Sequence, residues 1–442
     1  MWVAAITSSS NRGGYTTSRL AQEVLLPHRC QRGSPLHFSQ VKILVLAGLA
    51  TGCSFAPNAQ SLGTGDAGPP VLIDGDMIDG PGSNVILDAR MIDASPCWQW
   101  TPTNFDSCTL PAPAPLSVTG ALTISTDSPP NTLPSTVLTQ SDNSHLLVFH
   151  LSSLDISGSL TITGSIPVVF AVDTSATIEG SVATSAGAND TTRCATRAGS
   201  PGTASTASDT GGGGGGGAAG ADDGGDGTDG TNGNSPNGHG NHGAHGSKIT
   251  STLSPLVAGC AGGKGGSTNG NGTPGVGGSG GGAVQISAQQ SITIDGVINA
   301  AGHGSSVPTA QTGAGGGGSG GAVFLEGGAV TIAASASVCA DAGAGGQGGG
   351  SSNSGNGGST SPCSSTAGAV QLTTNLDNFG GTGGTGGFRT TTKGGNAGPA
   401  SNDSAGGHGA AGGGGGGGVG WIRLRGANSA PTVTGVLTPA PM

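Results

Sequence analysis

Three histidines are the residues whose type and spacing most directly suggest chemistry. His239, His242 and His245 follow one another at intervals of three in the segment NGHGNHGAHGSK. Imidazole nitrogens bind Zn²⁺, Ni²⁺ and Cu²⁺, and three of them in one loop could share a metal ion. We therefore predict a weak metal site at these histidines and expect no other cofactor. The alternative is that they only add polar groups to a glycine-rich loop.

Acidic side chains do not follow the pattern of an enzyme that cleaves polysaccharides. Such an enzyme needs paired carboxylates or a cleft with Arg and Lys, together with aromatic platforms for sugar rings. Charged residues make up only 9% of the chain and aromatic residues 3%. The acids of the expected strands never occupy neighbouring positions of one strand; they are Glu179, Asp295, Glu326 and Asp341. We therefore expect no enzymatic activity.

The overall charge excludes one class of partner. The 442 residues include 14 basic and 24 acidic side chains, a formal net charge of −10. Binding to nucleic acid depends on Lys and Arg that neutralise phosphates. We therefore expect no nucleic-acid partner. The segment GGDGTD at 224–229 fits half of a calcium-binding repeat, but it occurs once, and we interpret it as a chance match.

Cysteines indicate an exported, disulfide-bonded chain. Setting aside Cys30 and Cys53 leaves an even number, which could pair in 15 ways. Two sequential pairs bracket glycine-rich segments and a third closes a small loop with three aromatic residues. Closing such loops removes entropy from the unfolded chain. We therefore favour the pairs Cys97 with Cys108, Cys194 with Cys260, and Cys339 with Cys363.

The segment VKILVLAGLATGC, residues 41–53, has the order of positive, apolar and small residues that is typical of a secretory signal. Because it ends on Cys53, it resembles a bacterial lipoprotein signal, in which the cysteine is acylated and becomes the new N-terminus. The resemblance implies lipidation of Cys53, a bilayer as partner, and, with Ser54 after the cysteine, an outer-membrane location. We expect translation to begin at Val41, which would make residues 1–40 a wrongly assigned start.

Short alternating segments after residue 116 predict an all-β fold. The stretch GGAVQISAQQSITIDGVINAAGHG at 281–304 recurs in similar form at 320–346, and an echo begins at Ala367. Within one unit, Val and Ile fall at alternate positions of three short strands, with turns at Gln289 and Gly296. A coil of this kind predicts a parallel β-helix, also called a β-solenoid, with long Gly-rich loop insertions.

Glycine, at 92 residues, sits mainly between these expected coils. Insertions at turns are tolerated because the loop cost rises slowly with length. The tract at 211–247 is polar, and we expect it to be mobile; shorter runs could instead pack as extended polyglycine strands. The predicted organisation is a leader at 1–40, a signal at 41–52, a linker at 53–95, a first β segment at 96–190, a disulfide-bracketed loop at 191–260, repeats at 261–426 and a tail at 427–442.

Together, the lipoprotein signal, the linker, a CxW…C segment and the GGAVxL repeats resemble glycine-rich, predicted surface lipoproteins of large-genome Gram-negative bacteria. The resemblance spans most of residues 41–426 and implies location and architecture, but no reaction. We therefore expect a non-enzymatic, outer-membrane-anchored protein in surface structure, adhesion or matrix contact, with polysaccharide or matrix as partner. The alternatives are a polysaccharide-binding or polysaccharide-degrading β-helix protein and a metal- or ice-binding solenoid.

Overall fold

The computed structural model describes residues 97–235, 237–363, 369, 380–401 and 408–442, all within one unit of the chain, residues 84–442. The predicted leader, signal, lipidated Cys53 and linker lie outside the described residues, as does most of the echo that begins at Ala367. Among the described residues, no helix is long and apolar enough to cross a membrane.

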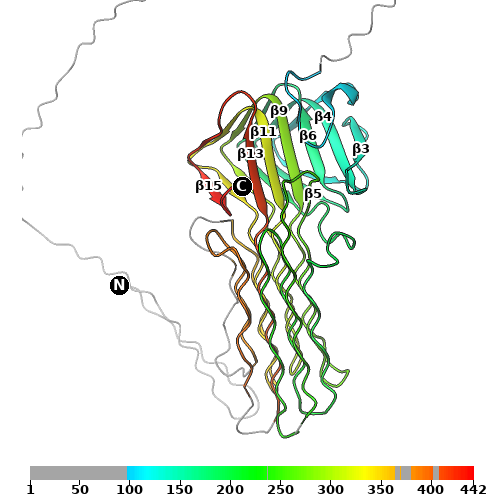
Figure 1. Cartoon of the computed structure of the whole chain (residues 1–442), viewed down its shortest axis with the longest axis vertical. Coiled ribbons are helices and arrows are strands. Elements are labelled where there is room, and N and C mark those ends of the chain that lie inside the picture. The colour runs from blue at the N-terminus through cyan, green and yellow to red at the C-terminus, as the bar shows by residue number, and fades with distance from the viewer. Residues whose placement is uncertain (1–96, 236, 364–368, 370–379, 402–407) are drawn as a thin grey trace, which may run out of the picture. The chain divides into compact units, whose positions relative to one another are not determined.

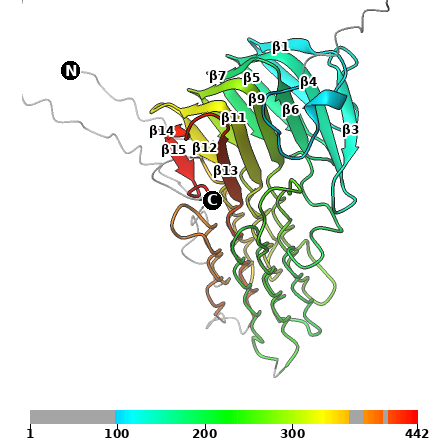
Figure 2. The same cartoon turned by 45° about the horizontal axis from the view of Figure 1, so that its top comes forward.

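Two sheets, almost entirely parallel, form one end of this unit (Figure 2). The first has nine strands in the order β1-β4-β6-β9-β11-β13, with β3, β7 and β14 beside this path; only the β3–β4 pair is antiparallel. The strands of this sheet are β1 Ala114–Val118, β3 Ser135–Thr139, β4 His145–Ile156, β6 Val168–Val172, β7 Ser175–Ile178, β9 Ala283–Ile294, β11 Ala322–Ile332, β13 Trp421–Gly426 and β14 Thr432–Val433. The described part of the chain also contains one 3-10 turn, η1, at Ser107–Thr109.

The second sheet has six parallel strands in the order β15-β12-β10-β8-β5-β2. Their bounds are β2 Ala121–Ser125, β5 Ser159–Thr163, β8 Ser181–Thr184, β10 Val297–Asn299, β12 Ser337–Cys339 and β15 Val436–Thr438. The predicted tail at 427–442 thus supplies β14 and β15. The hydrophobic core lies between the two sheets and combines side chains such as Ile286 and Ile292 of β9 with Ile298 of β10.

Stacked glycines form the turns between the sheets. A Cβ atom on Gly158 would lie 2.2 Å from the carbonyl oxygen of Gly120, one on Gly180 would lie 1.9 Å from that of Gly158, and one on Gly296 would lie 1.9 Å from that of Gly180. Only glycine allows successive turns to approach this closely. The turn that the sequence predicts at Gly296 is therefore present.

The glycine-rich tracts form a packed bundle that extends from the sheets (Figure 1). We call this part the glycine bundle. Its segments are 197–206, 211–220, 222–231, 238–248, 259–267, 275–282, 300–309, 311–321, 340–350, 355–361, 380–387, 392–398 and 409–420. Several are direct continuations of strands: 275–282 leads into β9, 311–321 into β11 and 409–420 into β13.

Segment 211–220 shows how the glycine bundle is held together. Its backbone N–H groups donate in rotation to segments 197–206, 222–231 and 311–321, at distances of 2.7 to 3.1 Å. Its carbonyl groups accept from segments 238–248, 259–267 and 409–420. Each neighbour is met at every third residue, which is the period of a polyproline II helix, with roughly three residues per turn. The segment thus bonds to six neighbours, and segments 311–321 and 409–420 do the same.

The structure corrects two of the predictions. The parallel β-helix with long Gly-rich loop insertions is wrong, although the all-β class holds. Strand β9 runs unbroken from Ala283 to Ile294, through the turn expected at Gln289, so the predicted three-strand coil is absent. The glycine tracts are not loops, because their backbone groups are bonded to one another, and residues 211–220 are all buried. The expected mobility is also wrong for 211–231 and 238–247, which pack as extended segments. The extended polyglycine packing that the sequence left open for the shorter runs thus also occurs in this longest tract.

Candidate functional site

Three disulfide bonds join the pairs that the loop argument favours. Cys97 bonds to Cys108, Cys194 to Cys260, and Cys339 to Cys363. The second bond lies where the bundle meets the sheets, and both of its cysteines are buried. Its two cysteines are 66 residues apart in the sequence, and the chain between them contains the first four bundle segments.

The three histidines of the predicted metal site lie in a row along segment 238–248. His242 Nδ1 is 2.6 Å from Asp229 Oδ1, His245 Nδ1 is 2.6 Å from Asp226 Oδ1, and His239 Nδ1 is 2.7 Å from Asn232 Oδ1. Three residues of an extended helix of this type advance about 9 Å. The imidazoles therefore do not converge on one point.

Each imidazole instead bonds to the neighbouring segment. Burial raises the pKa of Asp226 and Asp229, but hydrogen bonds from His245 and His242 outweigh it, so both pKa values lie below the ordinary value. Within the described part of the chain, no group of three or more His, Cys, Asp or Glu side chains could hold a metal ion. The row therefore connects two edge segments of the bundle through side chains.

Glu326 is fully buried on the outer face of β11 and organises a polar cluster there. Its carboxylate accepts hydrogen bonds from the backbone N–H and hydroxyl of Thr103, from Gln285 and from Ser287, and lies 3.3 Å from Nη1 of Arg425. Desolvation raises the pKa of Glu326 despite these bonds. These contacts fasten the residues around Thr103 to the sheet.

Asp341 is the second buried acid and is less well satisfied. Its Oδ2 accepts hydrogen bonds from the hydroxyls of Ser361 and Thr438, at 3.0 and 2.9 Å, while Oδ1 has no hydrogen-bond partner. Desolvation raises the pKa of Asp341 to about 7, against lowering by the two hydroxyls and by Arg389. Between about pH 4 and pH 7, the folded protein therefore keeps a proton on Asp341 that the unfolded chain, with the ordinary pKa of 3.8, has released.

The variant Asp341→Asn is expected to stabilise the protein at neutral and higher pH. The folded-state pKa is raised, so wild-type stability declines as the pH rises from about 4 to about 7, by an amount on the order of 3 kcal/mol. An amide has the shape of the protonated acid without this loss. Denaturant unfolding of both proteins at pH 4 and pH 8 measures it. A stability difference that is the same at both pH values would contradict the assignment.

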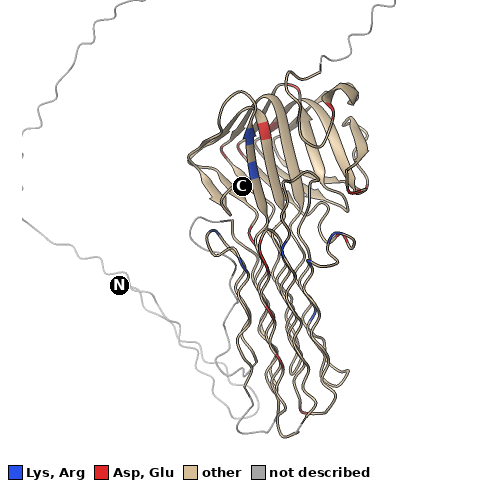
Figure 3. Ribbon diagram, viewed as in Figure 1, with Lys and Arg blue, Asp and Glu red and all other residues tan. Residues whose placement is uncertain are grey.

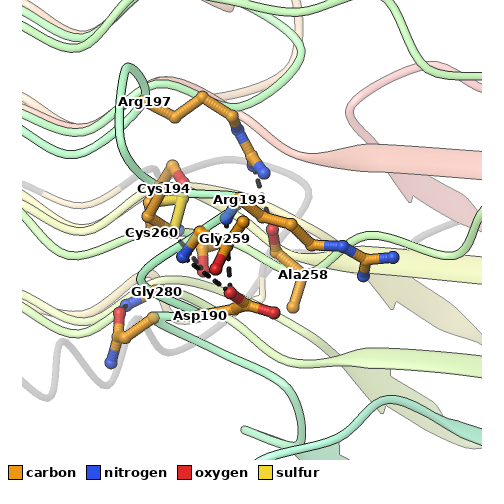
Figure 4. The surroundings of a disulfide bond; sticks show 11 residues. Asp190, Arg193, Cys194, Arg197, Ala258, Gly259, Cys260 and Gly280 are labelled. Atoms are coloured by element: carbon orange, nitrogen blue, oxygen red, sulfur yellow. Dashed lines mark hydrogen bonds between the residues drawn. A yellow bond between two sulfur atoms is a disulfide. The ribbon is translucent and has the colours of Figure 1, made fainter. Parts of the chain in front are cut away.

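A cavity of about 430 Å³ opens beside the Cys194–Cys260 disulfide, where the segment 249–257 crosses the junction of sheet and bundle. We call it the arginine cavity. Its wall contains two cations and one acid, with hydroxyl and apolar side chains around them: Asp142, Arg193, Arg197, Ile249, Thr250, Ser251, Thr252, Ser254, Pro255 and Val257. Figure 4 shows that Arg193 and Arg197 both lie close to the Cys194–Cys260 disulfide.

Arg193 and Arg197 have very different surroundings. Arg193 donates to Asp142 Oδ2 from Nε and Nη2, at 2.9 and 2.6 Å, so the carboxylate of Asp142 neutralises its positive charge. Arg197 is 1% exposed and donates from Nη2 to the carbonyl oxygen of Ala258 at 2.9 Å. Among the residues that the structure describes, its Nε and Nη1 have no hydrogen-bond partner. Burial, and then the charge of Arg193, lower the pKa of Arg197 to about 10.

Sequence reasoning did not single out the arginine cavity. The contacts of Arg197 come from Ala258 and Trp421, whose ring centroid lies 5.0 Å from its guanidinium carbon. The one feature of the sequence that points to this cavity is the pair of arginines around Cys194, because the chain has few Lys and Arg residues. Figure 3 shows that these residues are sparse over the described unit.

Comparisons with protein-family models, with curated proteins and with solved structures found no match to this chain.

Proposed function

We propose that this protein is a non-enzymatic surface lipoprotein, anchored in the outer membrane through an acylated Cys53, that contacts polysaccharide or extracellular matrix. The observation that supports this function is the arrangement of the glycine bundle. Its segments turn back at the end away from the sheets, in short polar connections rich in Asn, Ser, Thr and Gly. We call these connections the distal turns; they include 206–210, 268–273, 309–311 and 350–354.

The first described residues of the chain are attached to the sheets, at the end of the unit opposite the distal turns. Trp98 Nε1 donates to Asp173 at 2.9 Å, just after β6, and Trp100 Nε1 donates to the carbonyl oxygen of Gln289 in β9 at 3.2 Å. The chain therefore joins the unit at the sheets, and the distal turns lie at the other end of the bundle. Loops presented on a rigid scaffold are the usual place for binding residues.

The glycine bundle is suited to act as a scaffold for the distal turns, because few reactive or charged side chains lie on its own surface. Its interior consists of backbone groups that bond to one another, and its outer side chains at His239, His242 and His245 are engaged with the neighbouring segment. Lys and Arg are few along it (Figure 3). We therefore expect the distal turns to make the contact with a large polymer.

The variant with Asn271→Ala, Ser352→Ala and Asn353→Ala is expected to lose at least about tenfold of the affinity for a cell-surface polysaccharide on a glycan array, because binding residues cluster on such loops. All three side chains are exposed on distal turns. The matched control changes three exposed residues of the second sheet, Thr123, Ser159 and Thr161, to Ala and should bind like the wild type.

Three outcomes would contradict the proposal. Equal binding by both triple variants would exclude the distal turns as the contact. Release of reducing sugar from a bound polysaccharide would make the protein an enzyme. Recovery of the native protein in the soluble fraction, without detergent, would exclude the lipid anchor at Cys53.

A further inference from the structure

Arg197 carries a buried positive charge that nothing in the described surroundings neutralises. The acid in the wall of the arginine cavity, Asp142, is held by Arg193, with the shorter contact at 2.6 Å. The Arg197 guanidinium contacts the ring of Trp421 and the carbonyl oxygen of Ala258, and the nearby Arg193 adds a second positive charge. A buried cation is costly unless it is paired and its donors are satisfied.

The fold nevertheless holds Arg197 in place at several points. Its backbone N–H donates to the carbonyl of Cys194, one turn earlier, and its own carbonyl accepts from Ala219 and so belongs to the bundle lattice. The adjacent disulfide fixes Cys194 against Cys260 (Figure 4). The side chain thus cannot easily leave the junction, and its two unpartnered nitrogens, Nε and Nη1, remain as buried donors.

We propose that the arginine cavity binds a small organic acid of the acidic-sugar type. Its carboxylate is attracted by the unpaired charge of Arg197 and accepts hydrogen bonds from Nε and Nη1 once that side chain turns toward the cavity, because both nitrogens are buried in the structure described here. A carboxylate supplies both the missing charge and the missing acceptors. The rest of the wall suits the body of such a ligand, because it contains both hydroxyl side chains and the apolar side chains of Ile249, Pro255 and Val257. Its volume of about 430 Å³ leaves room for a sugar ring beside the carboxylate.

This site lies at the sheet end of the bundle and does not depend on the distal turns. The test is isothermal titration of the full mature protein at constant ionic strength, with sodium glucuronate as the probe and glucose as its neutral counterpart. The wild type should bind glucuronate at one site and bind glucose at least tenfold more weakly. Sulfate, tested in parallel, distinguishes an organic acid from an inorganic oxyanion.

Two variants connect the binding to Arg197. Arg197→Gln keeps a donor for the carbonyl of Ala258 but removes the charge, and it should weaken glucuronate binding at least tenfold. Lys264→Gln removes the same charge from an exposed position of the bundle outside the cavity wall and should bind like the wild type. If Arg197→Gln fails to fold, titration of the wild type can be followed through the NMR signal of the Arg197 Nε–H group, which glucuronate should shift and glucose should not.

The proposal would be overturned by any of four results. These are equal glucuronate affinity of wild type and Arg197→Gln, equal affinity for glucuronate and glucose, binding of sulfate without binding of glucuronate, and no measurable binding of glucuronate. Failure of glycan binding at the distal turns would leave all of these measurements unaffected, so the two proposals can fail separately.

Discussion

The variant Gly216→Ala is expected to prevent the glycine bundle from forming. A Cβ atom at Gly216 would lie 2.0 Å from the carbonyl oxygen of Ala244 and 2.4 Å from its carbonyl carbon, both backbone atoms of a neighbouring segment. No side-chain rotation can relieve such a clash, so the segments must move apart and lose their hydrogen bonds. We expect a loss of about 4 kcal/mol or more in the free energy of unfolding, or no soluble protein.

The matched control is Gly120→Ala. This glycine lies at an exposed turn between the sheets, and an added Cβ atom would meet nothing within 4 Å. The free energy of unfolding of this variant should differ from that of the wild type by less than about 1 kcal/mol. Denaturant unfolding followed by circular dichroism compares the two variants with the wild type. Equal unfolding midpoints for Gly216→Ala and Gly120→Ala would show that the bundle is not packed as described.

The sensitivity of the bundle follows from how it is stabilised. Ordering one residue's backbone costs about 1–2 kcal/mol, and glycine loses the most freedom on folding. A typical hydrogen bond returns a net of about 0.5–1.5 kcal/mol. Segments without side chains have no large apolar groups to offset this difference. The bundle therefore depends on close contact between backbones, on nearly complete hydrogen bonding, and on attachment to the sheets.

The sheets could be predicted from the sequence because apolar side chains report their surroundings. Val284, Ile286, Ile292 and Ile294 alternate, and all four face the core between the sheets. Alternation cannot, however, distinguish two short strands from one continuous strand. That is why β9 continues through Gln289, where a turn was predicted.

The sequence predicts packed polyglycine only as an alternative for the shorter runs, because glycine has no side chain to form an apolar pattern. A period of three was nevertheless present in segment 238–248: Gly240, Gly243 and Gly246 face inward while the histidines between them face outward. This period indicates an extended helix packed on one side. The same spacing of three also fits metal ligands in one loop, so the sequence alone does not distinguish the two arrangements. The arginine cavity lay beyond sequence reasoning, because Arg197 and Trp421 are brought together only by the fold.

Replacing Cys194 and Cys260 with Ser is expected to lower the free energy of unfolding by about 4 kcal/mol, because the loop-entropy relation grows with the enclosed length, here a separation of 66 residues. The enclosed chain includes segment 211–220, which is central to the bundle and cannot compensate through apolar contacts. Hydrogen exchange should therefore accelerate more at the amides of 211–220 than at those of β4. Denaturant midpoints and exchange rates, measured on the same samples, test both statements.

The matched control replaces Cys97 and Cys108 with Ser. That bond spans only 11 residues, for which the same relation gives about 3 kcal/mol, and it lies outside the bundle. Its loss should loosen the residues around Trp98 while leaving the exchange of 211–220 unchanged. If the control variant accelerates exchange in 211–220 as much as the Cys194 and Cys260 variant does, the disulfide at the junction has no special role in holding the glycine bundle together.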